Sequence, residues 1–386
     1  MTTVDLVYFN AGGGHKAASA ALQRVIQLQR RPWQVREINL TDVLDPSGLF
    51  KRITGMAPED LYNKRLASGF TLGLAQELKL LQGLIRLSHA GLVQRLARHW
   101  AGARPDLVVS LIPNFNRALH DSLAQACPGV PFVTVLTDMA DHPPAFWIEP
   151  GVAQHVVCGT QHALAQALAA GCPPQRVHLT SGMILRPEFY LGRYVDRAAE
   201  RNKVGLDAHT PTGLVLFGGA GSKVMKRIAS RLPDTPLILM CGRNPALADA
   251  LRALPARAPR VVVEFTPDVA HWMRLADFFI GKPGPGSLSE AVQQGLPVIV
   301  TRNAWTMPQE RWNTSWVQQH DLGVVLRSFA DVAEGVQLLT QRLPELKAKV
   351  QRLDNRAVFE VPRILERILA RHGAATQDHA AVPSLV

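Results

Sequence analysis

Short apolar runs rich in β-branched and aromatic residues recur along the 386-residue chain and alternate with longer segments of helical periodicity, such as residues 17–29 and 287–294. Strands inside a parallel sheet are buried on both faces, so they read as continuous apolar runs, and the helices that connect them cover the sheet. The pattern therefore predicts an α/β fold with parallel sheets. The expected strands are residues 4–10, 107–111, 132–137, 214–217, 237–241, 261–265, 278–281 and 298–301.

The alternation lapses once, between residues 186 and 212, where the chain becomes polar and charged. Each half opens with an apolar strand that runs into a glycine-rich turn, Gly12 to Gly14 in the first half and Gly218 to Gly221 in the second. Two similar openings predict two Rossmann-like domains that face a central cleft. The expected segments are an N-terminal domain of residues 1–190, a linker of 191–212, a C-terminal domain of 213–350, and a C-terminal helix with a frayed tail over 351–386, for which packing back on the N-terminal domain is one arrangement.

The composition limits the class of partner and the compartment. Lysine and arginine exceed aspartate and glutamate by 11, which favours anionic partners such as nucleotides, nucleic acid or acidic lipid. The four cysteines show no paired spacing, so a reducing cytoplasm is the expected location. No apolar run approaches the ~20 residues of a membrane-spanning helix and no secretory signal is visible, so we expect any membrane contact to be peripheral.

A basic amphipathic stretch indicates where such contact would be made. Residues 51–104 carry nine lysines and arginines but three aspartates and glutamates, interleaved with large apolar residues. A helix of this kind can lie in the interface of an anionic membrane, with Lys79 and Arg86 among its cations. The other interpretation is a core-facing helix with a solvated basic edge.

The strongest local signal for ligand binding is a glycine- and proline-rich turn, Gly281 to Ala291, between an apolar run and a helical pattern. Such a turn presents backbone N–H groups and a helix N-terminus to an anionic ligand, which makes Gly284, Gly286 and Ser287 candidate phosphate-binding residues. Glu290 follows one helical turn later, where its carboxylate can hold ribose hydroxyls.

A second polar cluster follows the next predicted strand. Gln309, Glu310 and Asn313 share one helix face and offer amide and carboxylate partners to a polyhydroxylated group. A solvated helix start would explain either cluster alone. Their occurrence in this order, one strand apart, favours a ligand that carries both a phosphate and a sugar.

The first glycine turn is compatible with more than one function. Gly12 to Ala17 satisfies a variant of the dinucleotide fingerprint, which would indicate a nicotinamide or flavin oxidoreductase with Glu37 as an awkward ribose-binding acid. Alternatively, His15 lies at a helix N-terminus, where the helix dipole lowers the imidazole pKa, so that His15 stays neutral and acts as a general base. A third interpretation is a tight turn in which His15 only caps the helix.

Polar residues also follow the third predicted strand. Asp138 and His142 lie where the carboxyl end of a parallel strand lines a ligand site, so they can orient His15 or bind an acceptor hydroxyl. The alternative is a proline-rich turn with an aspartate cap and an amphipathic edge at Trp147. Neither Asp141 nor His142 has neighbours in the sequence that would complete a metal site, so no metal is predicted.

Together these blocks resemble the monogalactosyldiacylglycerol synthase group of glycosyltransferase family 28, which is related to the N-acetylglucosaminyltransferase that makes lipid II. The similarity runs in one order between Asp5 and Leu326. It implies a GT-B fold, transfer of a sugar from a nucleotide donor with inversion, no cofactor, and work at a membrane surface that the enzyme does not span. The blocks that carry it are Gly12 to His15, Cys241 to Asn244, Gly281 to Ala291 with Gly295 to Pro297, and Pro308 to Glu310.

The resemblance also implies roles for individual residues. His15 takes the place of the catalytic base with Asp138 beside it, and which of the two accepts the proton stays open. Two departures from the family pattern are Asn10-Ala11 before the first turn and Trp305 near the sugar side. The implied acceptor-side residues are Gly13, Gly14, His142 and Trp147, and the implied donor-binding residues are Gly219, Gly221, Arg243, Gly284, Gly286, Ser287, Glu290, Gln309, Glu310 and Asn313.

The activity that the resemblance implies is transfer of galactose or glucose from a UDP-sugar to a lipid, with the hydroxyl of 1,2-diacylglycerol as acceptor, at the cytoplasmic face of the plasma membrane. One alternative is UDP-sugar transfer to a polyprenyl-linked acceptor in cell-envelope synthesis, and another is the dinucleotide-dependent oxidoreductase. A non-catalytic nucleic-acid-binding module would also fit the positive charge. Because the basic residues are not interleaved with an RNA-binding motif and four tyrosines give little stacking surface, no nucleic-acid partner is predicted.

Overall fold

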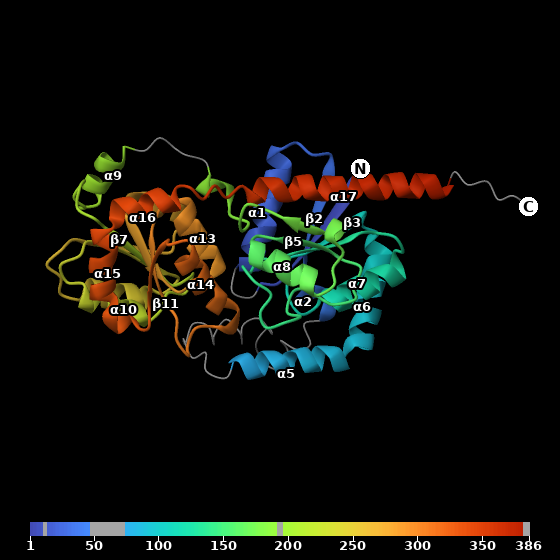
Figure 1. The fold of residues 1–386 in the computed structure, drawn as a ribbon, viewed down its shortest axis with the longest axis horizontal. Coiled ribbons are helices and arrows are strands. Elements are labelled where there is room, and N and C mark those ends of the chain that lie inside the picture. Colours follow the sequence, from blue (N-terminus) through green and yellow to red (C-terminus); the bar gives the residue numbers. More distant parts are fainter. Residues whose placement is uncertain (11–13, 47–73, 191–195, 381–386) are drawn as a thin grey trace, which may run out of the picture. The chain divides into compact units, whose positions relative to one another are not determined.

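The computed structural model describes residues 1–10, 14–46, 74–190 and 196–380 of the chain (Figure 1). Contacts divide these residues into two compact units. The first unit contains the described residues of 1–62, 76–186 and 356–386, and the second contains those of 63–75 and 187–355. Each unit is built on one six-stranded sheet, and every strand pair that the structure describes is parallel. The predicted α/β class is therefore confirmed.

The sheet of the first unit has the order β2-β1-β3-β4-β5-β6. Its strands are β1 (Thr2–Tyr8), β2 (Trp33–Asn39), β3 (Leu107–Ser110), β4 (Phe132–Val135), β5 (His155–Cys158) and β6 (Val177–Leu179). Its helices are α1 (Gly14–Leu28), α2 (Leu40–Leu44), α5 (Leu74–Leu87), α6 (His89–Ala103), α7 (Asn116–Ala126), α8 (Gln161–Ala169), the short η1 (Pro174–Arg176) and α17 (Ala357–Ala380).

Helices on the sheet bury the core of the first unit. Trp100 of α6 is fully buried in this core, and its indole N–H donates to the Ser122 hydroxyl of α7 at 3.0 Å, so the large ring is buried without leaving its polar atom unpaired. Asp5 is also fully buried, within β1. The Arg36 guanidinium of β2 pairs with it at 2.6 Å and 2.9 Å, which compensates the cost of burying the carboxylate.

The C-terminal helix α17 is part of the first unit and packs beside α1 (Figure 1). Arg31, just after α1, pairs with Glu366 of α17 at 2.8 Å. At the start of α17, the Glu360 carboxylate accepts hydrogen bonds from the backbone N–H and the hydroxyl of Ser181 at 2.7 Å and 3.0 Å. The chain therefore returns to its first unit after it has completed the second.

The sheet of the second unit has the order β12-β11-β10-β7-β8-β9. Its strands are β7 (Gly213–Leu216), β8 (Leu237–Gly242), β9 (Arg260–Glu264), β10 (Phe278–Gly281), β11 (Val298–Thr301) and β12 (Gly323–Leu326). Its helices are η2 (Pro187–Phe189), α9 (Arg197–Lys203), α10 (Val224–Arg231), α11 (Pro245–Arg252), α12 (Val269–Leu275), α13 (Pro285–Gln293), η3 (Pro308–Glu310), α14 (Arg311–Gln319), η4 (Phe329–Asp331), α15 (Val332–Gln341) and α16 (Leu343–Val350).

The strand order reverses once in each sheet, between β1 and β3 in the first unit and between β10 and β7 in the second. Connections leave such a switch point in opposite directions, which opens a crevice beyond the carboxyl ends of the two strands. All eight predicted strands are present, with ends that differ by at most two residues from the prediction. Four strands are absent from that prediction. Polar and charged residues interrupt the apolar pattern of β2, and histidine or glycine shortens the apolar runs of β5, β6 and β12, which are three or four residues long.

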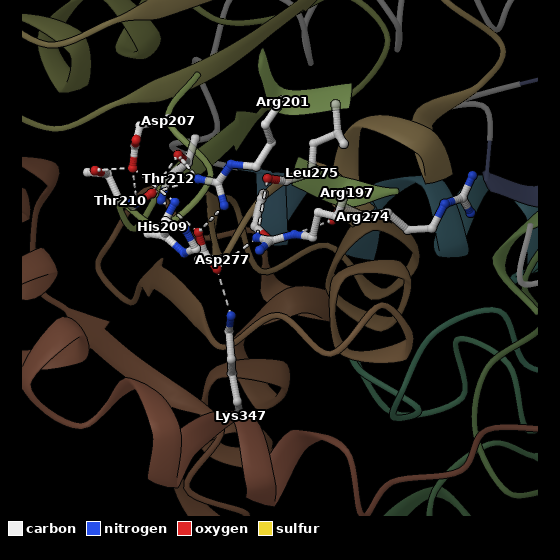
Figure 2. A network of polar contacts seen from close by, with 11 residues as sticks. Arg197, Arg201, Asp207, His209, Thr210, Thr212, Arg274, Leu275, Asp277 and Lys347 are labelled. Carbon is white, nitrogen blue, oxygen red and sulfur yellow. Dashed lines mark hydrogen bonds and ion pairs between the residues drawn. The ribbon is translucent and has the colours of Figure 1, made fainter. Parts of the chain in front are cut away.

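Residues 197–203, which we expected within a linker, form helix α9 and belong to the second unit. Figure 2 shows how its arginines are held. The Asp277 carboxylate accepts hydrogen bonds from Arg197 at 2.8 Å, from Arg201 at 3.1 Å and from Lys347 of α16 at 2.7 Å. The charged stretch is therefore an ordered part of this unit, because its charges pair with a carboxylate that lies far away in the sequence.

Asp277 is buried, and burial alone would raise its pKa. The Lys347 hydrogen bond, the backbone N–H of Thr212 at 2.9 Å and the positive charges of Lys347 and Arg197 outweigh burial and hold the pKa of Asp277 below its usual value. Arg201 is 1% exposed and also donates to the Thr210 carbonyl at 2.6 Å. This cluster ties α9, α16 and the turns before β7 and β10 together.

Replacing Asp277 tests how much the cluster contributes to stability. In Asp277→Asn the buried Arg201 loses its carboxylate partner, and we expect the free energy of unfolding of the second unit to fall by about 3 kcal/mol. Denaturant titration at neutral pH measures this. Asp234→Asn, which removes the carboxylate of the exposed Asp234–Arg257 pair, is the matched control and should change stability little. Equal effects of the two substitutions would contradict the role given to Asp277.

Candidate functional site

In the first unit, the segments that follow β1, β3 and β4 meet around His15. His15 is the second residue of α1, and its Nδ1 lies 3.1 Å from the hydroxyl of Thr137, which follows β4. A backbone hydrogen bond joins the imidazole to Leu111, which follows β3. His15 therefore lies beyond the carboxyl ends of the strands at the switch point, where ligands bind in folds of this kind.

The environment of His15 keeps its imidazole uncharged. Burial lowers the pKa of His15 from 6.5 to about 4, although the hydrogen bond with Leu111 acts in the opposite direction. The sequence predicts a lowered pKa through the helix dipole, and the structure assigns the lowering to burial instead. A neutral imidazole can accept a proton at physiological pH, as a general base must.

Asp138 and Trp147, both predicted site residues, lie next to His15. The rings of His15 and Trp147 have centroids 5.9 Å apart and are inclined at 51°. The indole N–H of Trp147 donates to the Asp138 carboxylate at 2.9 Å. The structure thus brings the three residues together in the order His15, Trp147, Asp138.

Asp141 organises the loop that carries Trp147, a role that the sequence pattern did not reveal. Its carboxylate accepts backbone N–H groups of Ala145, Phe146 and Trp147 at 3.1, 3.0 and 2.6 Å. Burial raises the pKa of Asp141, and these hydrogen bonds oppose the rise. An aspartate followed by residues such as proline is the available signal for a turn of this kind.

The other residues predicted to lie on the acceptor side are His142, Gly14 and Gly13. His142 is exposed in the same loop. Gly14 is the first residue of α1, is exposed, and has open space where a Cβ would lie. Gly13 lies outside the described residues.

In the second unit, the loop after β8 supports the glycine loop after β7. Gly242 has φ +60°, and a Cβ there would lie 2.2 Å from the Gly219 carbonyl oxygen, so the close approach requires glycine. The Arg243 N–H donates to that same carbonyl at 2.8 Å, and the Asn244 side chain donates to the Ala220 carbonyl at 3.1 Å. Gly221 packs against Leu247 and the β8 backbone, while Gly219 has open space at its Cβ position.

The Arg243 side chain, predicted to lie near donor phosphates, is exposed and stacks on an aromatic ring. Its guanidinium carbon lies 3.8 Å from the ring centroid of Phe265, just after β9. Phe265 is 52% exposed, so the pair forms a flat cationic and aromatic surface at the carboxyl edge of the sheet. Sequence reasoning did not single out Phe265, and the only signal was a lone aromatic residue at the end of a strand.

Helix α13 begins as the Gly281 to Ala291 pattern predicts. Gly284 is its N-cap and Pro285 its first residue, and the first helical hydrogen bond runs from the Leu288 N–H to the Gly284 carbonyl. The N–H groups of Gly286 and Ser287 therefore have no partner within the helix and are available to an anion. Ser287 and Glu290 are both half-buried on this helix.

The predicted sugar-binding residues lie next to that helix N-terminus, and most are buried. Glu310 is 3% exposed and pairs with Lys282 at 2.8 Å, and a Cβ on Gly284 would come within 3.3 Å of its carboxylate. The Asn313 amide N–H donates to the Pro283 carbonyl at 2.8 Å. These contacts bring the two predicted clusters together.

Two buried oxygens in this cluster lack a donor within the described parts of the chain. Gln309 Oε1 and Asn313 Oδ1 accept no hydrogen bond from any of the residues that the structure describes. Gln309 is 6% exposed and Asn313 is fully buried. A buried acceptor without a donor costs roughly 1–3 kcal/mol, so both oxygens suit a ligand that supplies hydroxyl or N–H groups.

No three or more histidine, cysteine, aspartate or glutamate side chains among the described residues are grouped to hold a metal ion.

No family model matches the chain. The chain is similar to the probable monogalactosyldiacylglycerol synthase 2, chloroplastic, of Oryza sativa subsp. indica, with 26% identity over 298 residues that cover 71% of this chain and 61% of that protein. It is also similar to monogalactosyldiacylglycerol synthase 2, chloroplastic, of Arabidopsis thaliana, with 29% identity over 258 residues that cover 63% of this chain and 54% of that protein. The matches thus span less than two thirds of these relatives. The resemblance to monogalactosyldiacylglycerol synthases is confirmed.

Solved structures match the fold over nearly the whole chain. MurG of Acinetobacter baumannii has a TM-score of 0.61 at 15% identity, covering 95% of this chain and 100% of that one. Anabaena Alr3699/HepE in complex with UDP-glucose has a TM-score of 0.54 at 15% identity, covering 96% of this chain and 100% of that one. The predicted GT-B fold is therefore confirmed, and at such low identity these likenesses concern the fold alone.

The lowered pKa of His15 predicts a pH dependence of stability. Because His15 resists protonation when folded but not when unfolded, stability should fall as the pH drops from about 6.5 to about 4. In His15→Gln we expect this loss to be smaller by roughly 2 kcal/mol. Urea titrations across this pH range measure the slope. Lys16→Gln, at a neighbouring exposed position, should keep the wild-type slope, and an unchanged slope in His15→Gln would refute the assignment.

Proposed function

We propose that this protein is an inverting glycosyltransferase that moves a hexose, galactose or glucose, from a UDP-sugar to a lipid hydroxyl, with 1,2-diacylglycerol as acceptor. The observation that carries the proposal is a pair of buried acceptors, Gln309 Oε1 and Asn313 Oδ1, which lie beside the α13 N-terminus and receive no hydrogen bond from the part of the chain that the structure describes. A helix N-terminus suits a diphosphate, and hydroxyl groups of a sugar would supply the missing donors. A nucleotide sugar has both groups.

The names of the similar proteins support the proposed acceptor and donor. The similar plant proteins are monogalactosyldiacylglycerol synthases, and a structural neighbour was solved with UDP-glucose. A lipid acceptor is consistent with the names of the plant proteins, and a UDP-sugar donor is consistent with the ligand of the structural neighbour. The oxidoreductase alternative finds less support, because Glu37, its ribose-binding candidate, already accepts a hydrogen bond from Ser19 at 2.7 Å.

In the proposed reaction His15 takes the proton of the acceptor hydroxyl. The hydroxyl oxygen then bonds to the anomeric carbon as the bond from that carbon to the diphosphate breaks, so the configuration inverts and UDP leaves. Charge that develops on the diphosphate is stabilised by the dipole of α13, by the N–H groups at its start that have no partner within the helix, and by Arg243. Glu290 holds the ribose, and Gln309, Glu310 and Asn313 hold the hexose.

We place the enzyme peripherally on the inner face of the plasma membrane, with helix α5 as the contact. Leu80, Leu84 and Leu87 lie on one face of α5 and are 66%, 53% and 87% exposed, and Lys79 and Arg86 are exposed as well. The Gln82 side chain of α5 donates to the Ala145 carbonyl at 3.3 Å, next to the loop of Trp147. Among the described residues, no helix is both long and apolar enough to span a membrane.

A transfer assay tests the function. The protein is incubated with a panel of UDP-sugars and with diacylglycerol or a lipid extract, and the product is identified by mass spectrometry and NMR. We expect a hexosyl lipid. A competent preparation that forms no glycolipid from any donor would refute the proposal. A product formed only on a polyprenyl-linked acceptor would show that diacylglycerol is not the acceptor.

Two variants separate the roles of the units. His15→Ala should lower transfer by at least about 100-fold and leave UDP binding intact, because general base catalysis contributes about 10²- to 10⁴-fold. Glu290→Ala should chiefly weaken UDP binding, measured by calorimetry. Full turnover in His15→Ala would show that His15 is not the base.

Vesicle sedimentation tests the membrane contact. Lys79→Glu combined with Arg86→Glu should weaken binding to anionic vesicles by at least about tenfold, since each cation near the surface contributes about 1 kcal/mol. The matched control is Lys226→Glu with Arg227→Glu, exposed on α10, which changes the net charge equally. If both double variants lose binding to the same extent, α5 has no specific role.

A further inference from the structure

All three polar groups of Trp147 are held within the first unit. Its backbone N–H donates to Asp141 at 2.6 Å, its backbone carbonyl accepts from the Asn116 side chain at 2.8 Å, and its indole N–H donates to Asp138 at 2.9 Å. The side chain is fully buried. A buried ring that is hydrogen-bonded at its indole N–H, on a backbone that is held at two further points, has one orientation.

The groups that hold Trp147 are themselves fixed. Asn116, at the start of α7, is fully buried and accepts the Ser110 hydroxyl from the end of β3 at 2.6 Å. The backbone of Asp141 is paired with the Gln166 side chain of α8 at 2.8 Å and 3.0 Å. Trp147 is therefore anchored to rigid elements of the sheet and its helices, although it lies in a loop.

This anchored ring lies beside His15, tilted by 51° to the imidazole. The ring centroids are 5.9 Å apart, so the indole excludes water from one side of the imidazole and limits its rotation. The hydroxyl of Thr137 lies 3.1 Å from His15 Nδ1 and restricts the imidazole further. The Asp138 carboxylate fixes the indole at its N–H edge, where it meets a neutral donor.

We propose that Trp147 is a positioning residue for His15, and that Asp138 acts by holding Trp147 and is not the group that takes the proton of the acceptor. The proposal rests on the proposed function, because the position of His15 matters to catalysis only if His15 acts as the base. It also decides between the two candidate bases, His15 and Asp138.

The two roles of Asp138 differ in what they require of its side chain. Accepting an indole N–H requires one oxygen, which the amide of asparagine also provides. Taking a proton from a hydroxyl requires the carboxylate itself. Asp138→Asn therefore keeps the first role and abolishes the second, whereas Asp138→Leu abolishes both.

Kinetics of these two variants form the first readout. We expect Asp138→Asn to keep most of the wild-type kcat, and Asp138→Leu to lower kcat by about 100-fold, the loss that a misplacement of about 1 Å can cause, with KM for the UDP-sugar unchanged. An Asp138→Asn enzyme as inactive as Asp138→Leu would overturn the proposal. So would an Asp138→Leu enzyme with wild-type kcat.

Titration of His15 is the second readout, and it needs neither the UDP-sugar nor the lipid acceptor. NMR of protein labelled with ¹³C-histidine reports the pKa of each imidazole, and the His15 signal is the one absent from His15→Gln. Wild type and Asp138→Asn should titrate at about 4, and Asp138→Leu should titrate closer to 6.5, because a displaced indole admits water. An unchanged pKa in folded Asp138→Leu would overturn the proposal.

Trp147→Phe provides a second route if Asp138→Leu fails to fold. It leaves Asp138 in place, removes the indole N–H, and should shift kcat and the His15 pKa in the same directions as Asp138→Leu. A Trp147→Phe protein that matches wild type in both would count against the positioning role.

The two readouts also separate this inference from the proposed function. If wild type forms no glycolipid but the titration shifts as expected, the proposed function fails and the coupling of Trp147 to His15 holds. If wild type is active and Asp138→Asn is not, the positioning role fails and the proposed function holds.

Discussion

Parallel strand pairing fixes where each unit can bind a ligand. Because all strands of a sheet point the same way, the loops that follow them gather at one edge, and the reversal of strand order at β1/β3 and at β7/β10 opens that edge. His15, Thr137 and Leu111 meet there in the first unit. In the second unit the loops after β7, β8, β10 and β11 carry every predicted donor-binding residue. The pairing direction thus brings together residues that are far apart in the sequence.

Buried carboxylates occupy both edges of the sheets but differ in their partners. Asp277, before β10, meets two guanidinium groups and an ammonium group, and it anchors the amino edge of the second sheet. The carboxylate of Asp141, after β4, accepts backbone N–H groups and shapes a loop at the carboxyl edge of the first. Ion pairing therefore stabilises the second unit at the end away from its candidate site. Backbone hydrogen bonds to Asp141 instead order the loop that carries Trp147 beside His15.

The sequence predicts those structural features that depend on residues close together in the chain. Apolar runs predict the eight strands, and the glycine-proline turn predicts the start of α13, because strand burial and helix capping depend on neighbouring residues. The pairs Asp138–Trp147 and Asn116–Trp147 could not be predicted, since their geometry exists only after the loop has folded. The same holds for Arg201, whose charge indicates a solvated linker until Asp277, 76 residues later, is placed beside it. Likewise, Gly242 is explained only by the Gly219 carbonyl that approaches it.

The return of α17 to the first unit determines the order in which the protein can fold during synthesis. Val361, Leu365 and Ile368 of α17 are buried in the first unit, yet the ribosome makes them after the whole of the second unit. At roughly 5–20 residues per second, the 169 residues from 187 to 355 take roughly 10–30 s to emerge. Throughout that interval the nascent first unit exposes the apolar surface that α17 will cover. The chain of the second unit is continuous over these residues, so this unit can complete its core first. The unit whose synthesis begins first is therefore the last to complete its fold.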